Sequence, residues 1–212
     1  MKRSLFYLFV LATLMQACGG PTQHITSYWA NKEAIPDKPY KTIYVMAITQ
    51  NENMQPAIEN GLADILSSKG RKVRLNSEIY PPSFSAVKQL SKEELIETIA
   101  KTESDGILTL AVLDTKTETT YNQGSYYAPM SYGYYGSYYG YYSHYYPVVY
   151  SPGYYSEDKT YYIETNFFDV ETDQLLWSIH SSAHNPASLD SFFEEYATTI
   201  RKKLLDEGLI DR

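Results

Sequence analysis

Apolar residues that recur every three to four positions predict three amphipathic helices. The first is expected to stop at Gly70, and the second to begin with a capping box made by Ser91 and Glu94. The third has Ser188 as its N-cap and Gly208 just past its end. One apolar stripe on each helix indicates packing against a sheet. The predicted helices cover residues 54–69, 92–100 and 189–204.

Short runs of β-branched, aromatic and other apolar residues predict five strands. The polar break from Glu171 to Gln174 lies between two such runs and indicates a tight hairpin. The strand that starts at Ile107 continues as polar alternation from Thr115 to Thr120, so we expect it to project past the core. The predicted strands cover residues 42–48, 71–75, 107–120, 160–170 and 175–179.

The order of the elements is β-α-β-α-β, an insertion, and then β-β-α. A mixed sheet of about five strands packed with three helices buries all of the apolar stripes, so the expected fold class is α+β with an α/β-like first half. We expect one globular domain over residues 41–212, interrupted by the insertion at 122–157.

The insertion is rich in tyrosine: residues 121–162 hold 17 of the 23 tyrosines of the chain, interleaved with Gly, Ser and Pro. It has few aliphatic residues, so we expect a mobile loop without a core of its own. One interpretation is a low-complexity linker that only needs to stay soluble. The other is a contact surface, since binding loops favour Tyr, Ser and Gly. The candidate binding residues are Tyr134, Tyr135, Tyr138, Tyr139, Tyr141 and Tyr142.

Tyrosine rings stack on the apolar faces of sugars and settle at membrane interfaces. Glycan, peptidoglycan, lipid headgroups or an envelope protein are therefore the expected kinds of partner. Self-association through the aromatic tract is a further possibility. A transmembrane hairpin is disfavoured because paired tyrosines and frequent Gly and Pro break the alternation that membrane strands need.

The N-terminus has the pattern of a secretory signal peptide over residues 1–17. Lys2 and Arg3 precede an apolar run at 4–15, which is too short to span a membrane. The run ends in a segment that resembles a bacterial lipobox, with Ala17 before the cleaved bond and Cys18 as acceptor of diacylglycerol and a palmitate-type acyl chain. A plain secretory signal with a chance cysteine is the alternative, but Cys18 is the only cysteine of the chain.

Residues 18–40 are expected to form a lipid anchor and flexible tether, because they are broken by prolines and lack apolar periodicity. Fully extended, such a tether reaches about 70 Å. Trp29 within it would pack on the domain or rest at the headgroups. Gly19 stands where Asp would favour retention in the inner membrane, so the outer membrane is the expected location, on a face that the sequence does not specify.

Charge and motifs argue against catalysis and nucleic-acid binding. Cleavage before Cys18 leaves 16 Lys and Arg against 25 Asp and Glu, a net charge of −9, whereas phosphate binding needs clustered bases. His180 and His184 share a face of a predicted strand at a separation of about 13 Å, too far for one metal ion. No phosphate-binding loop, nucleophile elbow or zinc-protease motif occurs. We expect no catalytic residue, metal or cofactor.

Three segments resemble the small α/β domain of envelope lipoproteins of the curli-secretion and penicillin-binding-protein-activator type. They are the strand at 43–48 before a long helix, the strand from Ile107, and the hairpin at 167–177. In that family a D-x-x-T-G-x-x-x-W-like turn joins the two strands, and here Asp173 replaces the Gly. The resemblance implies non-catalytic work in the envelope, such as binding or assembly.

Three functions follow as hypotheses. The first is a lipid-anchored binding or assembly module that presents the tyrosine-rich loop to an envelope or extracellular partner. The second is a structural or secretion-assembly subunit that oligomerises through its sheet or loop. The third, a hydrolase, would need a cleft with convergent carboxylates or a Ser/His pair.

Overall fold

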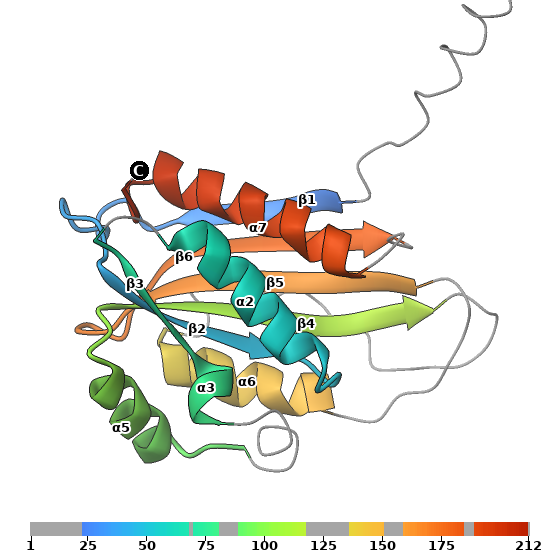
Figure 1. Ribbon diagram of the computed structural model, residues 1–212, viewed down its shortest axis with the longest axis horizontal. Helices are drawn as coiled ribbons and strands as arrows, with labels where there is room; N and C mark the ends of the chain where they lie inside the picture. The colour runs from blue at the N-terminus through green and yellow to red at the C-terminus, as the bar shows by residue number, and fades with distance from the viewer. Residues whose placement is uncertain are drawn as a thin grey trace, which may run out of the picture.

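A computed structural model describes residues 23–67, 70–80, 89–117, 136–150, 159–184 and 189–211. Over these ranges the chain forms one open, mixed sheet of six strands with helices on both faces (Figure 1). The α+β class predicted from the sequence is therefore confirmed. The strands are β1 Gln23–Ala30, β2 Thr42–Ile48, β3 Lys72–Leu75, β4 Gly106–Thr117, β5 Lys159–Asp169 and β6 Leu175–His184. The helices are α2 Met54–Leu66, α3 Asn76–Ile79, α5 Lys92–Thr102, α6 Tyr138–Tyr150 and α7 Leu189–Asp206.

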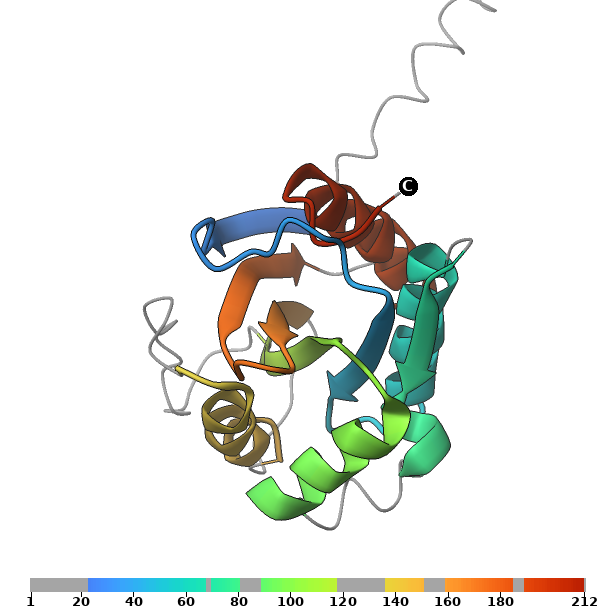
Figure 2. The same cartoon turned by 90° about the vertical axis from the view of Figure 1, so that its left-hand side faces the viewer.

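The strands lie in the order β1-β6-β5-β4-β2-β3. β2 is parallel to both β3 and β4, whereas β4, β5, β6 and β1 pair antiparallel in turn. Two parallel pairs require crossover connections, and α2 and α5 lie in these connections on opposite faces of the sheet. Figure 2 shows α7 and α2 on one side of the strands and α5 and α6 on the other.

Two apolar cores result, one on each face of the sheet. The first core joins α2 and α7 to the sheet through residues such as Ile58, Trp177 and Ile200. The second core joins α5 and α6 to the other face, and includes Ile99 and Phe168. A sheet buried on both faces explains why β2 and the first half of β4 are almost wholly apolar.

Several local signals in the sequence are confirmed. The capping box of Ser91 and Glu94 is present, with both of its hydrogen bonds, and the hairpin between β5 and β6 turns at the predicted place. Gly208 follows the end of α7 with a positive φ of 74°. The first helix ends at Leu66 instead of Gly70, whose φ of 95° places it in the connection to β3. The predicted N-cap Ser188 lies outside the described residues.

The flexible tether predicted for residues 18–40 is wrong from Gln23 onwards. Residues Gln23–Ala30 form β1, which pairs antiparallel with β6 over most of its length. Its β-branched and aromatic residues favour a strand, and pairing with β6 lets them complete the sheet. Trp29 is half-buried against the second core, which confirms the packing alternative for this residue.

Glu59 completes the sheet where β3 stops. β3 pairs with β2 only as far as Val45, and the Oε1 of Glu59 accepts the next free amide on that side, from Ala47, at 2.9 Å. Its Oε2 accepts the amide of Ser77 at 2.7 Å, and Gln55 donates to Oε1 at 3.3 Å. Burial raises the pKa of the Glu59 carboxyl against the effect of these hydrogen bonds. The carboxylate thus holds α2, β2 and α3 together.

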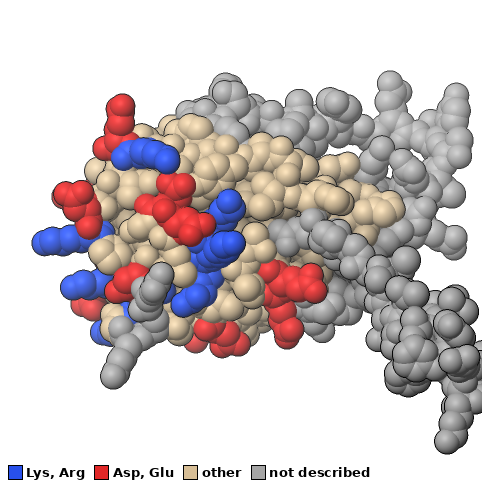
Figure 3. Space-filling view, turned by 90° about the horizontal axis from the view of Figure 1, so that it is seen from above, with Lys and Arg blue, Asp and Glu red and all other residues tan. Residues whose placement is uncertain are grey.

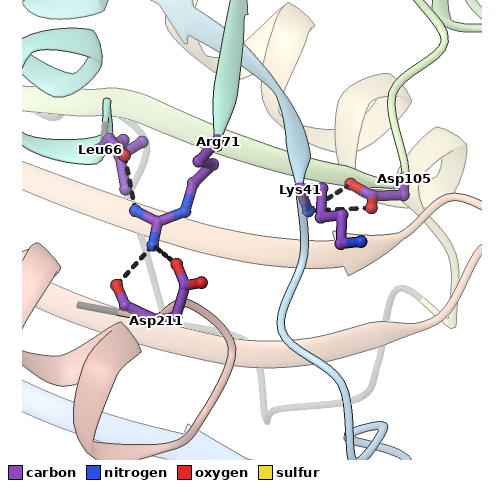
Figure 4. Close-up of polar contacts among 5 residues, drawn as sticks. All are labelled: Lys41, Leu66, Arg71, Asp105 and Asp211. Atoms are coloured by element: carbon purple, nitrogen blue, oxygen red, sulfur yellow. Dashed lines mark hydrogen bonds and ion pairs between the residues drawn. The ribbon is translucent and has the colours of Figure 1, made fainter. Parts of the chain in front are cut away.

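Figure 4 shows two polar clusters near the start of β2 and β3. The side chain of Asp105 accepts the backbone amides of Lys41, at 2.9 Å, and of Thr42, at 2.8 Å, which joins the starts of β2 and β4. The buried guanidinium of Arg71 donates to the carbonyl of Leu66 at 2.5 Å and to Asp211. Arg71 therefore ties the end of α2 to the last described residue.

Candidate functional site

The tyrosine-rich insertion contains a helix, contrary to the mobile loop predicted over residues 122–157. At the start of α6 the hydroxyl of Ser137 accepts the amide of Gly140 at 3.1 Å. The amide of Tyr138 donates to Oδ1 of Asp173, in the β5–β6 turn, at 3.0 Å. A carboxylate at a helix N-terminus is favourable, so the turn holds α6 against the sheet.

The conformation of Asp173 explains why this turn accepts Asp where the turn of the lipoproteins that the sequence resembles has Gly. It has a φ of 55°, the left-handed conformation that a Gly adopts without strain. Asp and Asn tolerate this conformation better than other residues with a side chain. Asp173 keeps the shape of the turn and supplies the carboxylate for α6, which Gly cannot do.

Most of the described α6 tyrosines point into the second core. Tyr138, Tyr141 and Tyr142 are at most 3% exposed. Tyr141 lies with its ring centroid 5.6 Å from that of Phe168 and 4.9 Å from that of Tyr145. Three of the predicted binding residues are therefore core residues, because burial of their rings supplies the apolar surface that the aliphatic-poor segment lacks.

The remaining predicted site residues are partly exposed or lie outside the described structure. Tyr139 is half-buried, and the Nζ of Lys92 lies 5.9 Å from its ring centroid. Tyr134, Tyr135 and the lipidation residue Cys18 lie outside the described residues. Of the six tyrosines chosen from the sequence, Tyr139 is the one that the described structure leaves partly accessible.

A buried polar cluster, which the sequence did not predict, lies on the sheet face that α6 covers. Glu164 of β5 is fully buried, and its Oε2 lies 3.1 Å from Nε2 of His180 on β6. Asn166 donates to the other oxygen of Glu164 at 2.7 Å. The strand period of two could have indicated this cluster, because Glu164 and Asn166 must share a face, as must Ser178 and His180.

Beside this pair, three polar residues form a row across β4, β5 and β6. Thr109 pairs with Asn166, and Asn166 with Ser178. Within the described part of the chain, Oγ1 of Thr109, Oδ1 of Asn166 and Oγ of Ser178 are buried without a hydrogen-bond partner. Buried oxygens of this kind are uncommon, so the row is an unusual polar feature of the second core.

The cluster does not have the geometry of a hydrolase. Ser178 and His180 are two positions apart on one strand, about 7 Å along its axis, and the hydroxyl of Ser178 makes no hydrogen bond to any residue that the structure describes. A nucleophilic serine needs its base within hydrogen-bond reach. His180 and Glu164 are almost wholly buried, which closes them to a substrate from outside. His184 is exposed and bonds Oγ1 of Thr160 through Nδ1 at 2.9 Å.

Metal ligation was the other chemistry considered for the histidines. Among the residues that the structure describes, no three His, Cys, Asp or Glu side chains lie close enough together to hold a metal ion. Nε2 of His180 lies 3.1 Å from the carboxylate of Glu164, and His184 bonds the hydroxyl of Thr160.

Comparisons with known proteins assign the chain to no family. No protein-family model and no curated protein matches the sequence. A PelC dodecamer from Paraburkholderia phytofirmans is 14% identical with a TM-score of 0.42, over 89% of this chain and 98% of that one. The lipoprotein GNA1162 from Neisseria meningitidis is 12% identical with a TM-score of 0.40, over 78% and 99%. Similarities of this size say nothing about activity, and the resemblance to curli-secretion and penicillin-binding-protein-activator lipoproteins stays a prediction.

Proposed function

We propose that this chain is a lipid-anchored, non-catalytic protein of the cell envelope that acts as a binding or assembly module at the membrane surface. One observation carries the proposal. The lipobox cysteine, Cys18, precedes Gln23, the first residue of β1, by only five positions. A lipid on Cys18 would thus be attached almost directly to the sheet, as suits a protein that works beside its membrane.

The membrane attachment depends on the lipid. None of the described helices is both long and apolar enough to cross a bilayer. Two or three acyl chains on one cysteine give stable anchoring. Gly19 after the cysteine favours the outer membrane as the location.

The non-catalytic part of the proposal is supported by the chemistry of the buried clusters. Glu59 accepts two hydrogen bonds from backbone amides of β2 and α3, and a third from Gln55 on its own helix. Glu164 and His180 bond each other inside the second core. All three side chains are buried in the described structure and bond other parts of the fold, which supports a structural role.

The expected partner is a glycan, peptidoglycan or an envelope protein. Tyr139 and Lys92 offer an accessible aromatic ring with a cation beside it, a pair that suits stacking on a sugar. Tyr134 and Tyr135, a few residues before α6, remain predicted contacts. We leave the buried tyrosines of α6 out of the proposed contact, because their rings lie in the second core.

A second candidate is an oligomeric structural or secretion-assembly subunit, and the position of β1 favours it. β1 is an edge of the sheet, eight residues long, and contains no Lys, Glu, Asp or Pro. Long edge strands without charge offer a pairing edge to another chain. The register shift between Ile25 and Ser27 limits such pairing to one half of the strand at a time.

The anchoring is tested by expressing the wild-type chain and Cys18→Ala in a Gram-negative host and fractionating the membranes. We expect acyl labelling and outer-membrane recovery for the wild type, and loss of both for the variant. Membrane recovery of Cys18→Ala equal to that of the wild type would contradict a lipid anchor.

The binding role is tested with purified domain and isolated peptidoglycan. Replacing Tyr134, Tyr135 and Tyr139 with Ser should reduce retention on peptidoglycan, whereas the distant, partly exposed Tyr28→Ser serves as the control. Equal retention of both variants would remove these tyrosines as the contact.

The second candidate, an oligomeric subunit, is tested by size-exclusion chromatography of the delipidated domain. A strictly monomeric protein would contradict it.

A further inference from the structure

Four strands project beyond the rest of the sheet at the end where β1 begins. β2 ends opposite Ala111, but β4 continues to Thr117 and remains paired with β5 as far as Lys159. On the other side of β5, β6 and β1 run to the same end, where Gln23 pairs with Ala183. In Figure 1 this end lies on the right. We call it the strand-end face and define it as residues 23–26, 112–117, 159–163 and 181–184.

The strand-end face is the part of the fold nearest to the lipid-bearing cysteine along the chain. Five residue steps separate Cys18 from Gln23, and a fully extended chain covers no more than about 17 Å over that length. β6 alone spans ten residues, about 30 Å. The tether is therefore too short for the opposite end of the sheet to approach the bilayer while the strand-end face points away.

The described side chains of the strand-end face suit contact with headgroups. Ile25 is 44% exposed, and Tyr161 and Tyr162 are half-buried. Tyrosine rings are favoured at the boundary between a membrane and water. Three further residues of these ranges are charged, with side chains outside the described set: Asp114, Lys116 and Lys159.

The opposite end of the sheet carries charges of both signs. The start of β4 and the β5–β6 turn carry Glu103, Asp105, Asp169, Glu171 and Asp173, whereas Lys41, Lys72 and Lys101 lie at or shortly before the starts of β2, β3 and β4. Figure 3 shows Lys, Arg, Asp and Glu side chains over the left and central parts of the visible face. A surface of mixed charge gains no net attraction to anionic headgroups.

We propose that the strand-end face lies against the headgroups of the membrane that holds the Cys18 lipid, and that the end of the sheet with the β5–β6 turn faces away from it. This inference rests on the proposed lipid anchoring. It adds an orientation: the end of the sheet with the β5–β6 turn is then the surface free to meet a partner.

The test uses the two ends of β6. Cys18 is the only cysteine and its sulfur is blocked in the lipoprotein, so one added cysteine gives a unique label site. His184→Cys labels the strand-end face and Gln174→Cys the opposite end; both residues are exposed. The purified lipoproteins, carrying a fluorophore, are reconstituted in phosphatidylethanolamine and phosphatidylglycerol vesicles that contain a nitroxide-headgroup lipid.

We expect the label at position 184 to be quenched several-fold more than the label at position 174. Equal quenching, or stronger quenching at 174, in protein that floats with the vesicles would overturn the orientation. Failure of the lipoprotein to float at all would instead overturn the lipid anchoring, so the two failures are distinguishable.

A longer tether supplies the matched control. Twenty Gly and Ser residues inserted between Gly20 and Pro21 give a coil with a root-mean-square span of about 22–27 Å. Quenching at position 184 should then fall towards the value at 174. Undiminished quenching with the long linker would overturn the short tether as the cause of the close approach.

Discussion

Gly106 allows the first residue of β4 to lie directly against two aromatic rings. A Cβ atom at this position would lie 2.6 Å from Cζ of Phe167 and 3.0 Å from Cδ1 of Tyr40. These rings contact each other with centroids 4.9 Å apart, and Phe167 is fully buried, so neither can move aside freely. The position requires glycine for lack of space.

Gly106→Ala should therefore destabilise the domain by about 1–3 kcal/mol, the usual cost of overpacking a core. Urea unfolding followed by tryptophan fluorescence measures the change. Gly61→Ala is the matched control, because nothing lies within 4 Å of its Cβ and alanine favours the middle of α2. A stability loss no larger than that of the control would show that the rings have room to shift.

Glu59 is the second position where one side chain decides the local structure. Glu59→Gln keeps one acceptor oxygen but replaces the other with an NH2 group. This donor then faces the backbone N–H of either Ala47 or Ser77. An unsatisfied buried donor costs about 1–3 kcal/mol, so we expect a loss of this size in the free energy of unfolding. Asp64→Asn on the same helix is exposed and should change the stability by about 0.5 kcal/mol or less. Equal losses of stability in the two variants would contradict the role of Glu59 in holding α2, β2 and α3 together.

The role of a residue could be predicted from the sequence where its partner lies close to it in the chain. The capping box of Ser91 and Glu94 joins residues three positions apart, so the sequence contains both partners. The contacts of Glu59 and Gly106 join segments that are distant in the chain, and no local pattern identifies their neighbours. Such roles appear only once the strands are placed side by side.

At the scale of elements, α6 shows how tertiary contacts can override local preference. Gly140 and Pro147 are poor helix formers, and the composition of the segment is that of a loop. The tyrosines at 138, 141, 142, 145 and 146 nevertheless follow the spacing of one helix face. Their burial over β4 and β5 supplies the stability that helix propensity does not.

Replacing a buried tyrosine of α6 should therefore act as a core substitution. We expect Tyr141→Ala to lower the free energy of unfolding by about 3–5 kcal/mol, because a fully buried ring is removed. Tyr139→Ala, on the half-buried side of the same helix, should cost about 1 kcal/mol or less. Urea unfolding of both variants gives the comparison. A loss for Tyr141→Ala as small as that for Tyr139→Ala would restore the mobile-loop interpretation.

At the scale of the whole molecule, β1 joins the proposed lipid anchor to the fold. It pairs with β6, packs Trp29 against the second core and sends the hydroxyl of Tyr28 to Glu207 of the C-terminal region. The segment Gln23–Ala30 is thus part of the domain, and the domain boundary at residue 41 predicted from the sequence leaves out one strand.

A soluble chain that begins at Pro21 should unfold with the stability of the full domain. A chain that begins at Lys32 loses the edge strand and exposes one side of β6, so we expect a clearly lower urea midpoint and aggregation at high concentration. Thermal and urea unfolding, with light scattering, measure both effects. Identical midpoints for the two chains would mean that β1 contributes nothing to the stability of the fold.

The sequence by itself determined the α+β class, the order of the main elements, the capping box and the β5–β6 hairpin, because each depends on periodicity or on residues close together in the chain. It also contains the lipobox pattern around Cys18, a local motif. Only the tertiary structure decided that Gln23–Ala30 completes the sheet, that the α6 tyrosines belong to the second core, and that Glu164 meets His180. These features depend on surface buried between distant segments, a quantity that no local window of the chain contains.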